Sequence, residues 1–222
     1  MFRKALVSTL LVLAVTSAAW AQPAKAEITA LIGYTLADGV SGDPYKAGNG
    51  QTYDRVDPKD SVMYGFSIGF FLSPNAELGF LWRRQPTTIQ LSGTATTDLA
   101  DNNIDGYHVY GAYYFGDPEG KVHPYILFGL GATNYGGFSF TTTSGQTSTI
   151  SGNAQFSTTW GAGVKVNASP KVGVKFGLQW TPTYIKSDAT GWWCDPYWGC
   201  YVVGDAQYSN QFEFNGGIVF RF

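Results

Sequence analysis

The last twelve residues of the chain, QFEFNGGIVFRF at positions 211–222, alternate between apolar and polar side chains. One side of this segment is apolar and carries Phe212, Phe214, Ile218, Phe220 and Phe222. The other side is polar and carries Gln211, Glu213, Asn215 and Arg221. Successive residues of a β-strand point to opposite faces, so the segment predicts a strand with one apolar and one polar face.

The same period of two recurs along the chain. Seven further segments show it, at 27–36, 62–72, 76–85, 106–115, 124–133, 156–167 and 171–180. The segments at 106–115 and 124–133 are aromatic or Gly-rich and less regular than the others. Together with the terminal segment, they predict eight strands and no helix.

Alternation by itself fits two arrangements. A soluble sandwich or a lipocalin-like barrel would turn the apolar faces inward, whereas a membrane barrel would turn them outward. The apolar faces carry bulky Phe, Trp and Leu with almost no small residues between them, while the opposite faces are crowded with Gly, Ser, Thr and charged residues. This distribution favours a narrow polar lumen inside an apolar wall.

The connections between the segments also alternate in length. Short turns are expected at 73–75, 116–123 and 168–170, and long polar loops at 37–60, 87–104, 136–155 and 185–208. Short turns on one side and long loops on the other are typical of outer-membrane barrels. Such barrels close because lipid offers no hydrogen-bond partner, so every backbone N–H and C=O must be satisfied within the protein. The sequence therefore predicts an all-β, eight-stranded antiparallel up-and-down transmembrane β-barrel, with both termini periplasmic.

The N-terminus has the features of a cleaved secretory signal. Met1–Lys4 is basic, the stretch 5–20 is mostly apolar, and Ala19–Ala21 forms an A-x-A cleavage site, with Ala24–Ala26 as a second candidate. The apolar stretch is shorter than the ~20 residues of a membrane-spanning helix. We therefore expect a signal peptide at 1–21 and one barrel domain at 22–222, in the outer membrane of a Gram-negative cell.

The composition agrees with a barrel in a membrane. Aromatic residues make up 16% of the chain and charged residues only 14%, against ~25% charged residues in typical soluble domains. Without Arg3 and Lys4 the remaining chain has 12 basic and 16 acidic residues and a formal charge of −4. A nucleic-acid partner would favour a basic face, so none is expected.

Two stretches carry a family resemblance, GYHVYGAYYFGDPEGKVHPYILFGLGATNY at 106–135 and FSTTWGAGVKVNASPKVGVKFGLQW at 156–180. They resemble the small outer-membrane β-barrel proteins, the opacity-type surface proteins and the membrane domain of outer membrane protein A. The resemblance implies this fold and location but no specific activity, because members share the barrel and differ in their loops. Ile218, Phe220 and Phe222 likewise resemble the C-terminal signal by which such barrels reach the barrel assembly machinery, although a buried terminal strand would show the same residues.

The polar faces bring charged residues into the lumen. These are Glu27, Glu77, Arg83, Lys165, Lys175, Glu213 and Arg221. Charges removed from water need partners, so we expect a paired network. It would act as a structural plug that fixes the register, or alternatively as the gate of a narrow pore.

Catalytic and metal sites are not expected. Of the two histidines, His108 has no Ser two residues on, and His123 falls in or beside a turn, so neither fits the base of a nucleophile. Five aspartates of the first loop (Asp38, Asp43, Asp54, Asp57 and Asp60) lack the spacing of an EF-hand. We expect a solvated acidic loop and no cofactor.

The stretch GWWCDPYWGC at 191–200 holds both cysteines, Cys194 and Cys200. No His lies nearby and the spacing is not C-x-x-C, which excludes a zinc or thioredoxin-like site. Outside the cytoplasm disulfides persist, so we expect a Cys194–Cys200 disulfide in the last extracellular loop. The aromatic residues around it either pack on the barrel rim or present a recognition surface; they are Trp192, Trp193, Tyr197, Trp198 and Tyr201.

These features predict a non-enzymatic surface protein that supports envelope integrity or surface contact. The loops would meet outer-membrane lipid, lipopolysaccharide or an unidentified cell-surface ligand. The alternative is a narrow, porin-like channel for small solutes.

Overall fold

The computed structural model describes residues 26–46, 50–141, 147–185, 194–195, 199–200 and 207–222. The predicted signal peptide at 1–21 and the aromatic residues Trp192, Trp193, Tyr197, Trp198 and Tyr201 lie outside these residues. The described residues contain no helix long and apolar enough to cross a membrane.

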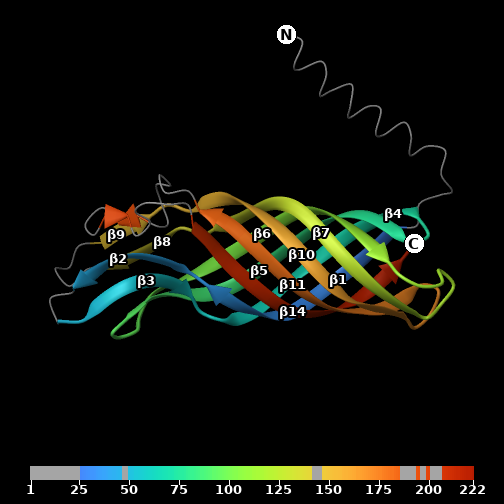
Figure 1. The fold of residues 1–222 in the computed structure, drawn as a ribbon, viewed down its shortest axis with the longest axis horizontal. Helices are drawn as coiled ribbons and strands as arrows, with labels where there is room; N and C mark the ends of the chain where they lie inside the picture. The colour runs from blue at the N-terminus through green and yellow to red at the C-terminus, as the bar shows by residue number, and fades with distance from the viewer. Residues whose placement is uncertain (1–25, 47–49, 142–146, 186–193, 196–198, 201–206) are drawn as a thin grey trace, which may run out of the picture.

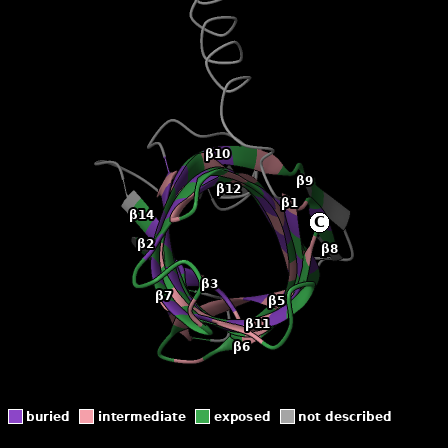
Figure 2. Cartoon of the chain, turned by 90° about the vertical axis from the view of Figure 1, so that its right-hand side faces the viewer, coloured by how far each residue is buried: buried purple, intermediate pink, exposed green. Residues whose placement is uncertain are grey.

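Eight long strands form a closed antiparallel barrel, as predicted (Figure 1, Figure 2). They are β1 (Ala26–Asp38), β4 (Ser61–Ser73), β5 (Ala76–Gly93), β6 (Thr97–Tyr114), β7 (Val122–Tyr135), β10 (Asn153–Asn167), β11 (Val172–Ile185) and β14 (Gln207–Arg221). Each strand pairs with its neighbours in the chain, and β1 pairs with β14 from Glu27–Arg221 to Asp38–Asn210. This last pairing closes the ring, so the barrel has no free edge.

The side chains follow the predicted alternation. In β1, Ile28, Ile32 and Tyr34 are exposed on the outer wall, whereas Glu27 and Thr29 are buried inside. The same division holds in β14, where Phe212 and Phe214 face outward and Glu213 faces the lumen. The wall is thus apolar outside and polar inside, the arrangement that a bilayer requires.

The two ends of the barrel differ, and we name them the terminal end and the loop end (Figure 1). The terminal end holds Ala26, the C-terminus and the short turns at 74–75, 115–121 and 168–171. Gly116 in the second turn has a φ of 95°, a conformation that favours glycine. The loop end holds all the long connections.

The loop end contains more strand than the sequence predicted. Loops were expected at 37–60, 87–104 and 136–155. The segment 37–60 instead contains the strands β2 (Val40–Lys46) and β3 (Thr52–Pro58). The segment 136–155 contains the strands β8 (Phe138–Thr141) and β9 (Thr147–Ile150). In the segment 87–104, β5 and β6 run on until only residues 94–96 separate them. The expectation of loops was wrong there because Thr, Asp and Asn interrupt the apolar outer face, while the apolar Ile89, Leu91 and Ile104 lie on the lumen side of their strands.

The first hairpin extends the wall. Where β4 begins at Ser61, β3 takes its place beside β5, pairing Pro58 with Ile89 and Tyr53 with Gly93. A spanning strand needs ~9–11 residues, and β5 has 18. The β2–β3 hairpin and the ends of β5 and β6 therefore project beyond the membrane belt.

Candidate functional site: the barrel interior

The lumen begins at the terminal end with a charge cluster around Glu27. Its carboxylate lies 2.9 Å from the Lys165 ammonium and 2.9 Å from the Arg221 guanidinium. Glu27 and Lys165 are almost completely buried, whereas Arg221 is partly exposed at the barrel end. One acid thus pairs with two bases, Arg221 on the adjacent strand β14 and Lys165 on the more distant strand β10.

A second cluster surrounds Glu77. The hydroxyl groups of Tyr110 and Tyr114 both donate hydrogen bonds to its carboxylate, and the Lys175 ammonium lies 3.6 Å away. Lys165 links the two clusters, because its ammonium lies 4.0 Å from the centre of the Tyr114 ring. Cation–π contact of this kind is strongest where water is excluded.

Further along the lumen, Arg83 forms an ion pair of 2.9 Å with Glu213. The amide of Asn215 donates to the other oxygen of Glu213 at 2.8 Å. The structure therefore brings all seven predicted lumen charges into four ion pairs, each of which joins residues more than 90 positions apart in the chain.

A layer of neutral polar groups follows. Nε2 of His108 and Oγ of Ser157 lie 2.9 Å apart, and Thr133 donates to Ser157 at 3.0 Å. Thr183 donates to Thr133 at 3.1 Å and so joins the layer to β11. Nδ1 of His108 is buried with no hydrogen-bond partner, so the pair lacks the acid that would orient a catalytic His.

An apolar cluster closes the loop end. The β2–β3 hairpin contributes Val40 and Val56 to it, and the barrel strands and β8 contribute Ile89, Ile104, Tyr135, Phe138 and Ile185. All of these side chains are at least 93% buried. They form a plug between the polar lumen and the loops.

The interior is filled. A void beside Arg83 and Glu213 has a volume of about 10 Å³, and so has one beside Tyr110 and Lys175. Each is about the size that holds one water. A barrel of eight strands is expected to be filled by its own side chains.

Sequence reasoning missed three features of this interior: the tyrosines around Glu77, the His108–Ser157 pair and the apolar plug. The tyrosines had a signal, because Tyr110 and Tyr114 share the parity of the lumen face in β6. The other two depend on contacts between distant strands, which alternation does not encode.

The remaining predicted sites lie outside the lumen. Cys194 and Cys200 are directly opposite each other in the hairpin of β12 (Cys194–Asp195) and β13 (Gly199–Cys200). Ile218, Phe220 and Phe222 are exposed on the outer wall. Among the described residues no group of three or more His, Cys, Asp or Glu side chains is placed to hold a metal ion.

Comparison with solved structures finds the same fold in small outer-membrane barrels. Outer membrane protein OprG from Pseudomonas aeruginosa matches with a TM-score of 0.60 and 13% identity, over 90% of this chain and 97% of that one. Neisserial surface protein A matches with a TM-score of 0.54 and 14% identity, over 89% and 97%.

Outer membrane protein AlkL, solved in lipid bilayers, matches with a TM-score of 0.54 and 14% identity, over 91% and 92%. No family model and no curated protein sequence matches the chain. Structural likeness at these sequence identities shows the fold. The predicted resemblance to small outer-membrane barrels is therefore confirmed. The chain folds as an eight-stranded β-barrel of the outer-membrane kind.

Proposed function

We propose that the chain is a non-enzymatic surface protein of the outer membrane that acts through its loop end. The terminal end faces the periplasm and the loop end faces the exterior. The observation that carries this proposal is the filled lumen, whose charges are paired and whose voids measure about 10 Å³. With the interior closed, the surfaces left for a partner are the loop end and the outer wall.

The loop end supports a role in contact. Its charges are paired: Arg55 forms ion pairs with Asp38 and Asp57, and the hydrogen bond that Arg55 donates to Asp57 raises the pKa of the Arg55 guanidinium. Lys59 pairs with Asp98 at 2.6 Å and so ties the first hairpin to β6. A rigid base of this kind can present loops to lipopolysaccharide or to a ligand on another cell.

The last loop is the first place to test. We propose that Cys194 and Cys200 form a disulfide, because directly opposed residues of an antiparallel pair have Cα atoms ~4.5–5.5 Å apart, within the range of disulfides. Cells that display the unaltered protein are compared with cells that display a variant in which Gly-Ser-Gly replaces residues 191–201. Attachment to neighbouring cells and resistance to a large antibiotic should both be measured.

The expected result is a loss of one of these properties with normal amounts of folded barrel. A matched control replaces the turn at 117–120, at the opposite end, and should change neither. If cells without the protein match cells with it in both measurements, the proposal is wrong.

A narrow channel remains the second candidate, favoured by buried polar atoms without partners. Oε2 of Glu27, Nη2 of Arg83 and Nδ1 of His108 have none in the described structure. Rearranged ion pairs would give these atoms new partners and open a path. Conductance measurements separate the two candidates.

We also propose that the chain has no enzymatic activity. The His108–Ser157 pair is its nearest approach to a catalytic arrangement, and both side chains are 99% buried inside the lumen. Mass spectrometry of lipid A from cells that overproduce the protein should show an unchanged product pattern. A new lipid A species that disappears in Ser157→Ala would contradict this.

A further inference from the structure

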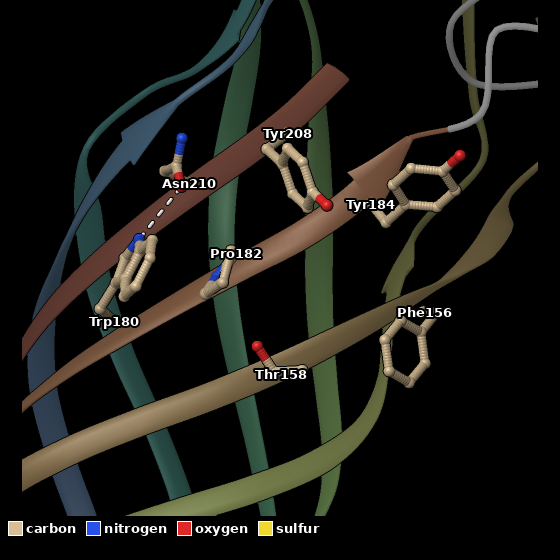
Figure 3. A pocket seen from close by; sticks show the side chains of 7 residues that line it. All are labelled: Phe156, Thr158, Trp180, Pro182, Tyr184, Tyr208 and Asn210. Atoms are coloured by element: carbon tan, nitrogen blue, oxygen red, sulfur yellow. Dashed lines mark hydrogen bonds between the residues drawn. The ribbon is translucent and has the colours of Figure 1, made fainter. Parts of the chain in front are cut away.

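The outer wall carries a groove of about 590 Å³ at the loop end of β10, β11 and β14 (Figure 3). Its lining consists of outward-facing residues at successive positions of three adjacent strands. Pockets that bind small ligands have volumes of ~300–1,000 Å³ and aromatic walls with a few placed polar groups. The size and the wall of this groove fit that description.

The lining is arranged in rows that run across the strands. The row nearest the loops is aromatic and consists of Phe156, Tyr184 and Tyr208, with the two tyrosine rings 5.7 Å apart. At the side nearest the membrane centre the groove is lined by Trp180. The neighbouring strands place Trp160 and Phe212 beside it, just outside the lining, and Trp180 and Phe212 are stacked at 6.2 Å. Between these two aromatic rows lies a row of smaller residues, Thr158, Pro182 and Asn210, which forms the floor.

The floor has polar groups available to a ligand. The Trp180 indole donates to Oδ1 of Asn210 at 3.0 Å, and the Trp160 indole donates to Oγ1 of Thr158 at 3.1 Å. These bonds orient both rings, and each uses one acceptor position of a floor side chain. The Asn210 amide group and the Thr158 hydroxyl proton remain as donors.

Pro182 adds a backbone feature to the floor. β10 and β11 pair Ser157 with Thr183 and Trp160 with Trp180, but no pairing joins the residues between these positions. Proline has no N–H to donate to the neighbouring strand, and proline is normally excluded from strands inside a sheet. Pro182 therefore supplies no ladder N–H, and the pairing of β10 with β11 is interrupted beside the floor row.

The height of the groove indicates which kind of ligand it meets. It lies at the loop end of the apolar belt, where tyrosine and tryptophan typically mark the level of the headgroups. None of the seven lining residues is charged, so a phosphate group would find no counter-ion there. A sugar ring fits the aromatic walls and the polar floor, because its C–H faces pack on aromatic rings and its hydroxyl rim both donates and accepts hydrogen bonds.

We propose that this groove binds the neutral sugar headgroup of a glycolipid in the outer leaflet. The sugar lies across the floor row between the two aromatic rows, and the acyl chains descend along the wall past Trp160 and Phe212. The choice of leaflet rests on the orientation proposed above, whereas the binding itself rests only on the groove.

The test uses the full-length mature protein in vesicles of dioleoylphosphatidylcholine that contain a small fraction of monoglucosyl dioleoylglycerol in both leaflets. Because the two lipids share their acyl chains and both leaflets are alike, only the headgroup differs and the orientation does not matter. After gentle extraction, native mass spectrometry counts the lipids retained on the protein. We expect the glucosyl lipid to be enriched by about fivefold over its bulk fraction, the ratio that one or two net hydrogen bonds give.

Two variants test the floor independently. Asn210→Leu and Thr158→Val should each reduce the enrichment severalfold, and both face outward, so the barrel should still fold and show its heat-dependent shift on a gel. The matched control is Asn103→Leu, an exposed asparagine on the outer face of β6 at the same end, which should keep the enrichment.

Equal retention of both lipids by the unaltered protein would overturn the proposal, because it would show that the groove accepts acyl chains regardless of the headgroup. Enrichment that survives in both floor variants would also overturn it, as would an equal loss in Asn103→Leu. Failure of the loop-end role leaves these outcomes unchanged, so the two proposals can fail separately.

Discussion

Glu27 shows how single residues hold this barrel together. Its side chain is 1% exposed and pairs with Arg221 on the adjacent strand β14 and with Lys165 on β10, which is not a neighbour of β1 in the ring. A charge in such a place is tolerated only while its partners remain. That these residues face the lumen could be predicted from alternation, but which acid meets which base could not. Pairing depends on how strands distant in sequence are staggered after closure.

Removal of the Glu27 carboxylate should therefore be costly. Glu27→Ala leaves Lys165 buried without its acid, and we expect a loss of ~3–5 kcal/mol in the free energy of unfolding. The measurement is urea unfolding in lipid vesicles, followed by tryptophan fluorescence. Glu119→Ala, in an exposed turn at the terminal end, serves as the control and should stay within ~0.5 kcal/mol. Equal values for the two variants would show that the ion pair does not stabilise the lumen.

Gly69 tests the packing beside the second cluster. A Cβ at this position would lie 1.8 Å from Oε1 of Glu77, so Gly69→Ala must displace the carboxylate that Tyr110 and Tyr114 hold. Overpacking of this kind costs ~1–3 kcal/mol. Gly111→Ala is the matched control, since its Cβ would meet nothing closer than 3.9 Å. Unfolding in vesicles should separate the two, and equal stability would refute the tight packing around Glu77.

At the scale of elements, β14 and the β12–β13 hairpin carry different tasks. β14 closes the ring against β1, and the backbone N–H of Phe222 donates to the carbonyl of Ala26 at 2.9 Å. The small hairpin stands outside the barrel sheet and contains both cysteines. The alternation of QFEFNGGIVFRF was sufficient to predict β14, because both of its faces have a fixed environment. The hairpins of the loop end had no such constraint and were not predicted.

The hairpin prediction concerns the thiols. Without reductant, neither Cys194 nor Cys200 should react with iodoacetamide in the unfolded protein, and after reduction both should. The double change of both cysteines to Ser should leave barrel insertion intact and free only the last loop, since closure of a seven-residue ring contributes ~2 kcal/mol locally. Two reactive thiols before reduction, or a double variant that fails to insert, would contradict this.

The terminal strand prediction separates recognition from stability. Phe222 is 72% exposed on the outer wall, so Phe222→Ala removes little packing within the protein. We expect the variant to fold normally from urea into vesicles but to accumulate less folded barrel in cells, because we propose that the assembly machinery recognises this residue. Heat-dependent migration on gels measures both fractions. Equal loss in vesicles and in cells would assign the residue to stability instead.

For the whole molecule, the filled lumen separates the terminal end of the barrel from a loop end that we propose faces the cell exterior. The fold followed from three signals in the sequence: period-two alternation, bulky residues on one face and connections of alternating length. The wall and the lumen face could thus be predicted. The apolar plug and the outer groove could not, because both arise where residues from several strands meet.

The most direct test of this account is electrical. Purified protein in planar bilayers should give no steady single-channel steps, because paired charges, tyrosines and the apolar plug fill the lumen, with voids of about 10 Å³ beside Arg83 and beside Tyr110. A general porin prepared in the same way shows that the bilayer and the detection work. Steady, reproducible steps from the pure protein, absent from a mock preparation, would contradict the filled lumen and favour the channel.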